Sequence, residues 1–215
     1  MPPGETLASF GSSVVADSLR DLGYFDRTAS YGVRPVRREH VATGPARIAA
    51  FEAVGPDDDR GFLPLAAFID SCRPGEVLVL AGAEGASPGS LWGEICSTAA
   101  ARRGCAGVVI DGYMRDELAI ERMDLPVFSR GAFPQDCLGR SMVAEGRTEA
   151  VCGAVLVSTG DWVVADADGV VFVPAELLST VLETAAEKRR AEHALLDAVA
   201  AGESLAEAVK RVGTL

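Results

Sequence analysis

The chain has 215 residues, of which 48% are hydrophobic and 24% are charged, and its formal net charge at neutral pH is −11. This size and apolar content suffice for one large core, and no linker, repeat or low-complexity block divides the chain. The acidic balance argues against nucleic acid as a direct partner, because binding to a phosphate backbone needs a basic surface.

The first half of the chain alternates between predicted helices and strands. The N-terminal residues show neither the basic region nor the apolar run of a signal peptide, and no segment approaches a membrane span, so we expect a cytoplasmic protein without membrane contact. Apolar periodicity and stop signals predict helices at 12–22, 62–72 and 91–103, the first ending at Gly23 and the third at Gly104, and strands at 46–53 and 77–80.

The second half is richer in strands. Apolar, β-branched runs predict strands at 107–111, 125–129, 151–158, 162–165 and 169–173, with Asp168-Gly169 as a hairpin turn. A long helix follows from Pro174 to Gly202, and Ser204 with Glu207 forms a capping box for a last short helix. We therefore expect an α/β fold: one domain, 1–215, with a mixed central β-sheet flanked by helices. Its core would span 1–173 and its helical extension 174–215.

The most informative segment is 93–116. Glu94 falls in the first turn of a helix, where unpaired backbone N–H groups can receive an anion. Arg115 and Asp116 leave the sheet at the carboxyl end of the strand at 107–111, the edge where open α/β sheets bind ligands. Each feature alone also fits a solvated ion pair or compensation of the helix dipole, but together they predict a site.

Several residue types limit the chemistry of that site. The two lysines, Lys188 and Lys210, fall in the polar C-terminal region, which argues against a Schiff-base aldolase. Two histidines cannot form a His-rich metal site, so a hard cation with oxygen ligands, Mg²⁺ or Mn²⁺, fits better. The five cysteines form no Cys-x-x-Cys pair, and we expect them to be reduced and mostly buried. The glycine-rich loop 82–89 lacks the Gly-Lys-Ser/Thr of a P-loop and is predicted to wrap one side of the Glu94 pocket.

The segment 93–116 resembles the signature of the family that contains the regulator of ribonuclease activity A (RraA) and the 4-hydroxy-4-methyl-2-oxoglutarate aldolases. The matching residues are Gly93-Glu94-Ile95, Arg103-Gly104, Gly107 to Gly112 and Arg115-Asp116. Further landmarks in the order of the family are Asp17-Ser18-Leu19, Gly44-Pro45-Ala46, Pro74 to Val79 and Gly160 to Val171. The resemblance covers nearly the whole chain and implies an RraA-like fold of the swivelling β/β/α type.

The resemblance implies a divalent-metal-dependent lyase that releases pyruvate. Such an enzyme cleaves a C–C bond of a 4-hydroxy-2-oxo acid by retro-aldol chemistry, or decarboxylates oxaloacetate, through a metal-stabilised enolate. The catalytic residues would be Arg115, Glu94 and Asp116. The substrate would bind to Arg115 and to the helix start formed by Gly93, Glu94, Ile95 and Cys96. Asp116 would hold the metal directly and Glu94 through a water that takes the hydroxyl proton.

Two other functions stay open from the sequence. Some members of the family are regulators that bind a ribonuclease without catalysis, although the intact set of Glu94, Arg115 and Asp116 favours an enzyme. A member with a specialised substrate is the other possibility, since Ile95 and Cys96 stand where leucine and methionine are common in the family.

The C-terminal helix adds an expectation about assembly. In the aldolase branch this helix reaches a neighbouring subunit, which implies a homotrimer or hexamer. Glu192 would then approach a neighbour's metal through a water, with Glu187 as the alternative. Asp111, Asp17, Trp92 and Tyr113 are left outside the catalytic set, because capping and packing explain them equally well.

Overall fold

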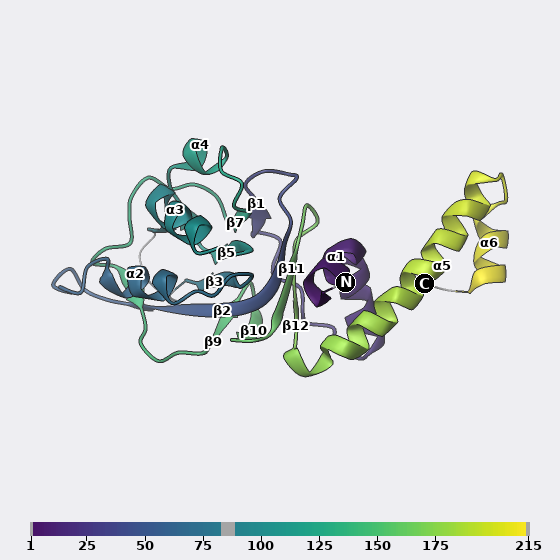
Figure 1. Ribbon diagram of the computed structural model, residues 1–215, viewed down its shortest axis with the longest axis horizontal. Coiled ribbons are helices and arrows are strands. Elements are labelled where there is room, and N and C mark those ends of the chain that lie inside the picture. The colour runs from purple at the N-terminus through teal and green to yellow at the C-terminus, as the bar shows by residue number, and fades with distance from the viewer. Residues whose placement is uncertain (1, 83–88, 214–215) are drawn as a thin grey trace.

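The structure is a computed structural model that describes residues 2–82 and 89–213 (Figure 1). Its helices are α1 (Pro3–Asp21), α2 (Leu63–Asp70), α3 (Glu94–Arg102), α4 (Glu117–Ile120), the 3-10 turn η1 (Ala175–Leu177), α5 (Leu178–Ala200) and α6 (Leu205–Val212). Its strands are β1 (Arg34–Pro35), β2 (Ala42–Ala53), β3 (Val77–Ala81), β4 (Ser90–Trp92), β5 (Gly107–Asp111), β6 (Tyr113–Met114), β7 (Val127–Ser129), β8 (Ser141–Val143), β9 (Glu149–Cys152), β10 (Val155–Ser158), β11 (Trp162–Ala165) and β12 (Val170–Val173).

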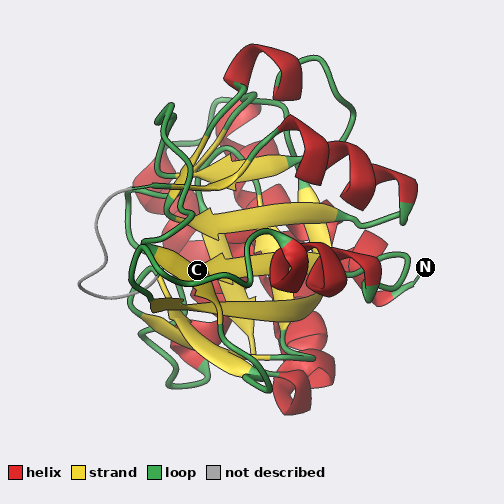
Figure 2. Cartoon of the chain, turned by 90° about the vertical axis from the view of Figure 1, so that its left-hand side faces the viewer, coloured by secondary structure: helices red, strands yellow, loops and turns green. Residues whose placement is uncertain are grey.

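One mixed sheet organises the molecule, with strand order β1-β7-β5-β3-β2-β11-β12. The strands β2, β3, β5 and β7 run parallel, whereas β1, β11 and β12 pair antiparallel with their neighbours. The long strand β2 also pairs with β8 beyond its parallel stretch, and β9–β10 forms a separate hairpin. Figure 2 shows the strands gathered in the middle of the molecule with helices around them. The predicted α/β fold with a mixed sheet, flanking helices and a long C-terminal helix is confirmed.

Successive side chains of the central strands point to opposite faces of the sheet, and this alternation divides the core into separate clusters. In β3, Leu78 and Leu80 belong to the cluster that packs under α2 and α3, whereas Val77 and Val79 face the cluster that contains the β9–β10 hairpin. These side chains are fully buried, as expected for parallel strands covered on both faces. A third cluster joins α1 and α5 to β11 and β12. The α2–α3 layer and the α1–α5 layer therefore occupy different parts of the sheet (Figure 1).

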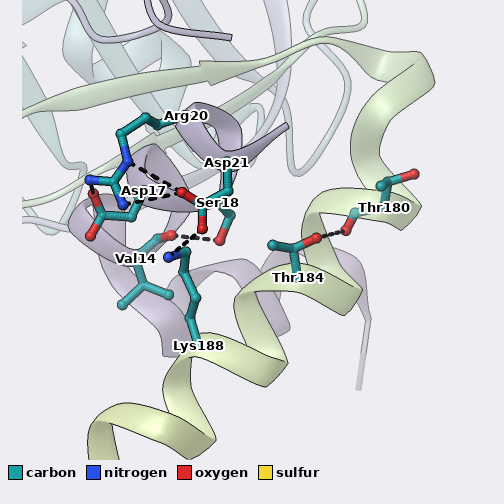
Figure 3. A network of polar contacts seen from close by, with 8 residues as sticks. All are labelled: Val14, Asp17, Ser18, Arg20, Asp21, Thr180, Thr184 and Lys188. Carbon is teal, nitrogen blue, oxygen red and sulfur yellow. Dashed lines mark hydrogen bonds and ion pairs between the residues drawn. The ribbon is translucent and has the colours of Figure 1, made fainter. Parts of the chain in front are cut away.

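Polar contacts fasten α5 to α1 (Figure 3). The Lys188 ammonium lies 2.6 Å from the Asp21 carboxylate, and the Lys188 side chain is 9% exposed. The polar neighbours of Lys188 in the sequence suggested a solvated side chain, but the structure buries it. The Arg189 guanidinium also donates to the carbonyl of Phe10. The later turns of α5 and the helix α6 extend away from the sheet (Figure 1).

Several element boundaries differ from the sequence-based expectation. Leu91 and Trp92 belong to the short strand β4 and not to the helix that follows, because β4 pairs with β6. The stretch predicted as one strand at 151–158 is the β9–β10 hairpin, which turns at Gly153 and Ala154 with positive φ at both. The first helix begins at Pro3, with an interruption at Gly11 (φ 79°).

The predicted end signals of the other helices agree with the structure. Gly104 follows α3 with φ 76°, and Ser204 accepts a hydrogen bond from the backbone N–H of Glu207 at 3.3 Å, as a capping box requires. All five cysteines are free, and four of them are buried. Within 2–82 and 89–213, none of the helices has the length and apolar character needed to cross a bilayer.

Candidate active site

The candidate site forms where the small β4–β6 sheet meets the start of α3. The backbone N–H of Arg115 donates to the carbonyl of Trp92 at 2.9 Å, which places the end of β6 beside the end of β4. The Asp116 carboxylate then accepts a hydrogen bond from the Glu94 backbone N–H at 3.0 Å. Residues that are 22 positions apart in the sequence are thereby brought to one helix N-terminus.

Gly93 permits this close approach. A Cβ at position 93 would lie 2.8 Å from the Asp116 Oδ2 and 3.3 Å from the Arg115 Cγ, and the first distance is too short for real Cβ contacts. Gly93 is itself buried and extended, so its importance comes from space rather than from a positive φ. The Gly-Glu pair of the sequence motif therefore has a steric reason: the glycine admits the Arg-Asp pair.

Asp116 has an unusual backbone. Its φ of 62° and ψ of 35° fall in the left-handed region, which among non-glycine residues Asp and Asn tolerate best. This conformation ends β6 and starts α4 abruptly. The Asp116 side chain is 43% exposed, so its carboxylate stays accessible from solvent while one oxygen contacts α3.

Arg115 lies between two carboxylates. Its Nη1 is 3.5 Å from the Asp136 Oδ2, and its Nε is 3.9 Å from the Asp116 Oδ2. Both contacts are longer than a strong charge-assisted hydrogen bond, and the Arg115 side chain is 42% exposed. The guanidinium therefore keeps donors available for a ligand.

These groups border a cavity of about 240 Å³. Its polar lining comes from Ser90, Arg115, Asp116 and Asp136, together with the backbone of Gly93. Its remaining lining is apolar or sulfur-containing: Phe62, Leu65, Leu91, Trp92, Ile95, Cys137 and Leu138. A cavity with few convergent polar groups and apolar walls is typical of a site for a small molecule.

The start of α3 provides anion-binding donors. The backbone N–H groups of Gly93, Ile95 and Cys96 find no acceptor among the described residues, and they precede the first intrahelical bond, from Ser97 to the Gly93 carbonyl. A carboxylate bound there would also gain from the helix dipole. Burial raises the pKa of the Cys96 thiol to about 11, so this thiol is protonated at neutral pH, and Cys96 is not among the residues that line the cavity.

The donor set suits a cation that keeps most of its water. Among the residues that the structure describes, no group of three or more His, Cys, Asp or Glu side chains could hold a metal ion. A zinc or calcium cage is therefore a poor fit to this region. Mg²⁺ and Mn²⁺ are commonly bound through one or two carboxylates plus water and substrate oxygens, and the exposed Asp116 oxygen offers such an anchor.

The structure does not bring every predicted residue to this site. Glu94 is exposed at the helix start and is not among the residues that line the cavity, although its backbone N–H contacts Asp116. Glu192 lies on α5, 3.4 Å from Arg189, and Figure 1 places α5 far from α3 in the same chain. Glu187 is exposed on the same helix. A role for either glutamate at this site would require a second chain.

The residues left outside the catalytic set have visible structural roles. Asp111 pairs with Arg130 and accepts a hydrogen bond from the Gly153 N–H at 2.7 Å, so it joins β5 to the β9–β10 hairpin. Asp17 pairs with Arg20 on the surface of α1 at 2.7 Å. Trp92 is buried, and its indole N–H donates to Ser97 at 2.7 Å.

Tyr113 packs against Phe133 with the ring centroids 5.8 Å apart, outside the residues that line the cavity. The loop predicted at 82–89 falls largely on 83–88, outside the described residues.

Sequence reasoning missed Asp136 and the apolar lining from Phe62, Leu65 and Leu138. Asp136 follows β7 by several residues in a loop, where its Oδ1 accepts a hydrogen bond from the Leu138 N–H at 3.3 Å. Such an Asx turn is a structural signal and says nothing about proximity to Arg115. The pairing of β4 with β6 and the bridges around Ser90 bring the loop to the site.

Comparisons with known proteins relate this chain to one protein family. The RraA-like family model, described as Aldolase/RraA, matches residues 12–172. A protein of Halalkalibacterium halodurans named putative 4-hydroxy-4-methyl-2-oxoglutarate aldolase is 27% identical over 183 residues, which cover 85% of this chain and 81% of that protein.

Two solved structures are similar across most of the chain. Streptomyces coelicolor RraAS2, described as an unusual member of the RNase ES inhibitor RraA protein family, has a TM-score of 0.79 and 26% identity, and the match covers 88% of this chain and 94% of the other. A protein of Pseudomonas syringae has a TM-score of 0.84 and 25% identity, covering 96% and 94% of the two chains.

Proposed function

The chain belongs to the Aldolase/RraA family, and from this premise we propose that it is a divalent-metal-dependent lyase that releases pyruvate. Its substrate would be a 4-hydroxy-2-oxo acid cleaved by retro-aldol chemistry, and oxaloacetate would be decarboxylated at the same site. The name of the Halalkalibacterium relative supports a carbon–carbon lyase.

One observation supports this proposal above the others: a loosely paired guanidinium beside a helix N-terminus, in one cavity. Arg115, the amides at the start of α3 and the Asp116 carboxylate all border that cavity or its rim. A 2-oxo acid presents a carboxylate and a keto oxygen on adjacent carbons. The helix amides suit the carboxylate, and the Arg115 donors suit the keto oxygen.

The chain's own residues would divide the chemistry as follows. The α3 amides hold the carboxylate, which fixes the orientation of the 2-oxo group. Arg115 donates to the keto oxygen and stabilises the negative charge that grows there as the C–C bond breaks, which is differential binding of the transition state. The Glu94 carboxylate accepts the proton of the C4 hydroxyl. Loss of CO₂ from oxaloacetate needs no such base.

Asp116 would hold the divalent cation. Mg²⁺ or Mn²⁺ bound there would supply a Lewis acid that lowers the energy of an enolate. The two lysines of the chain do not offer an alternative of the Schiff-base type, since Lys188 is paired with Asp21 at the α1–α5 contact and Lys210 is exposed on α6.

We also propose that the site is completed between subunits of a trimer or hexamer. Glu192 cannot serve its own chain's cavity, as α5 extends from the other part of the sheet (Figure 1). Its carboxylate would instead hold water near the Asp116 site of a neighbour.

The direct test is an assay for pyruvate release from oxaloacetate and from several 4-hydroxy-2-oxo acids, with Mg²⁺ or Mn²⁺ added. We expect turnover that excess chelator abolishes and that metal restores, and that persists when borohydride is added with substrate. Full activity in chelator would contradict the metal role. A folded protein inactive on every substrate would favour the protein-binding regulator instead, the role named for the family of the Streptomyces relative.

A further inference from the structure

The cavity beside Arg115 offers more apolar surface than a 2-oxo group needs. Pyruvate itself is small and polar, and its carboxylate and keto oxygen would be satisfied by the α3 amides and Arg115. Yet six lining side chains are purely hydrocarbon or aromatic: Phe62, Leu65, Leu91, Trp92, Ile95 and Leu138. They leave room for a second, apolar part of the substrate.

The charge of the cavity supports the same conclusion. Arg115 is the one cationic side chain among the described lining residues, and it already lies between Asp116 and Asp136. A second carboxylate on the substrate would therefore meet Asp136 without a further positive partner among the described lining residues, which is unfavourable.

Three of the apolar residues form an accessible rim. Phe62 is 44% exposed, Leu138 46% and Ile95 73%. Leu65 and Trp92, by contrast, are almost fully buried and form the walls. A hydrocarbon chain bound between the rim and the walls would remove apolar surface from water on both partners, which is the main source of affinity for such a group.

On the basis of the proposed function, we propose that the substrates are 4-hydroxy-2-oxo acids whose C4 carries a hydrocarbon group in place of a carboxylate. In the retro-aldol step the C3–C4 bond breaks, the C4 hydroxyl gives up its proton, and C4 becomes the carbonyl of an alkyl or aryl aldehyde or ketone. The electron pair of the broken bond forms the enolate of pyruvate, which is then protonated at C3. No oxidant or reductant takes part.

The experiment compares three kinds of substrate with Mg²⁺ present. Oxaloacetate, whose second carboxylate leaves as CO₂, reports the lyase site without an aldol acceptor. 4-Hydroxy-4-methyl-2-oxoglutarate keeps its second carboxylate on the acceptor, and a series of 4-hydroxy-2-oxo acids carries linear C4 chains of increasing length. We expect kcat/KM to rise about fourfold for each added methylene until the cavity is filled, the scale of burying one methylene. The best chain should exceed the dicarboxylate by at least about tenfold.

The outcomes separate the two proposals. Turnover of oxaloacetate with a flat chain-length series, or with the dicarboxylate preferred, would overturn the apolar substrate class while the lyase function stands. Inactivity on all substrates, oxaloacetate included, would overturn both.

A substitution in the rim provides an independent test. Leu138→Lys adds a cation to the lining at a position exposed enough to keep the fold. We expect the ratio of kcat/KM for the dicarboxylate to that for the best alkyl substrate to rise about tenfold, because the new ammonium can pair with the second carboxylate. The matched control is Leu118→Lys on α4, which is 70% exposed and does not line the cavity. An unchanged ratio in Leu138→Lys would overturn the assignment of this cavity to the acceptor half.

Discussion

Arg115 is the residue whose loss should affect turnover most directly. If it stabilises an enolate oxygen, Arg115→Ala should lower kcat by roughly two to three orders of magnitude, the scale of one lost oxyanion donor. Arg115→Lys should recover little of this loss, because an ammonium lacks the planar fork of the guanidinium. Steady-state kinetics on oxaloacetate would measure both variants.

The control for this prediction is Arg122→Ala, a change of an exposed arginine outside the cavity lining. It should leave kcat within about twofold of the wild type, as expected of surface changes away from a site. Near-normal turnover of Arg115→Ala would mean that Arg115 only holds the Asp136 loop.

His40 should make the stability of the protein sensitive to mild acid. It is 4% exposed, and its Nδ1 accepts a hydrogen bond from the Val127 N–H at 3.2 Å. Burial lowers the pKa of His40 below its ordinary value, so the unfolded chain binds the proton more readily than the folded one. Stability is therefore greatest above about pH 6.5 and falls as the pH drops through the range between the unfolded and folded pKa values.

We expect the free energy of unfolding to decrease as the pH falls below 6.5, by no more than about 1.4 kcal/mol per pH unit. Urea unfolding at pH 7.5, 6.5 and 5.5 would measure this slope. His40→Asn keeps a hydrogen-bond acceptor near Nδ1 without a titrating ring, and should flatten the slope in that range. His193→Gln, at an exposed position, is the matched control. Equal slopes for His40→Asn and the wild type would contradict the assignment.

At the scale of elements, the helices and strands that the sequence predicted correctly are those encoded within a few neighbouring residues. The buried run at 107–111 became β5, and Gly104 ended α3, because β-branched periodicity and a positive φ are encoded within a few residues. The same locality explains why Glu94, Arg115 and Asp116 could be found together: all three lie in one helix–strand unit.

The features that the sequence analysis assigned wrongly or missed depend on contacts between segments far apart in the chain. Trp92 was assigned to a helix because its pairing with Met114 depends on β6, which is too short to recognise from its sequence. Asp136 was missed because the loop that carries it reaches Arg115 only through tertiary bridges. The apolar cavity lining was also missed, since it is assembled from α2, β4 and that loop.

The helix α5 consists of two parts that truncation should distinguish. Val181 and Ala185 are fully buried against α1 and its neighbours, whereas the later turns extend outward. A chain ending at Val173 should lose at least about 3 kcal/mol of stability, because apolar surface on α1 and β12 becomes exposed. A chain ending at Arg190 keeps the Lys188–Asp21 pair and should unfold at nearly the wild-type temperature.

Thermal unfolding followed by circular dichroism would measure both truncations. The chain ending at Arg190 also removes Glu192 and should lose activity by roughly 10–100-fold, the usual effect of removing a group that orients a metal-bound water. Equal destabilisation of the two chains would mean that the outer turns of α5 stabilise the monomer. Full activity of the chain ending at Arg190 would exclude Glu192 from the mechanism.

At the scale of the whole molecule, the proposed sharing of sites can be tested by mixing. Asp116→Ala should be inactive on its own, and Glu192→Ala should keep only about 1–10% of the wild-type activity. After subunit exchange, some pockets would combine an intact Asp116 from one chain with an intact Glu192 from another, and pyruvate release should partly recover. No recovery despite exchange confirmed by mass spectrometry would place Glu192 outside a shared site.

The left-handed backbone of Asp116 has a consequence for how such a protein can change over evolutionary time. Few residues adopt a φ of 62° at low steric cost, mainly glycine, asparagine and aspartate. The codons of asparagine and glycine each differ from an aspartate codon by a single base. A point mutation can thus remove the carboxylate while the turn, the sheet and the outer surface persist. One base change can therefore inactivate the proposed catalytic site without disturbing the fold. Selection could then act on the binding properties of the protein alone.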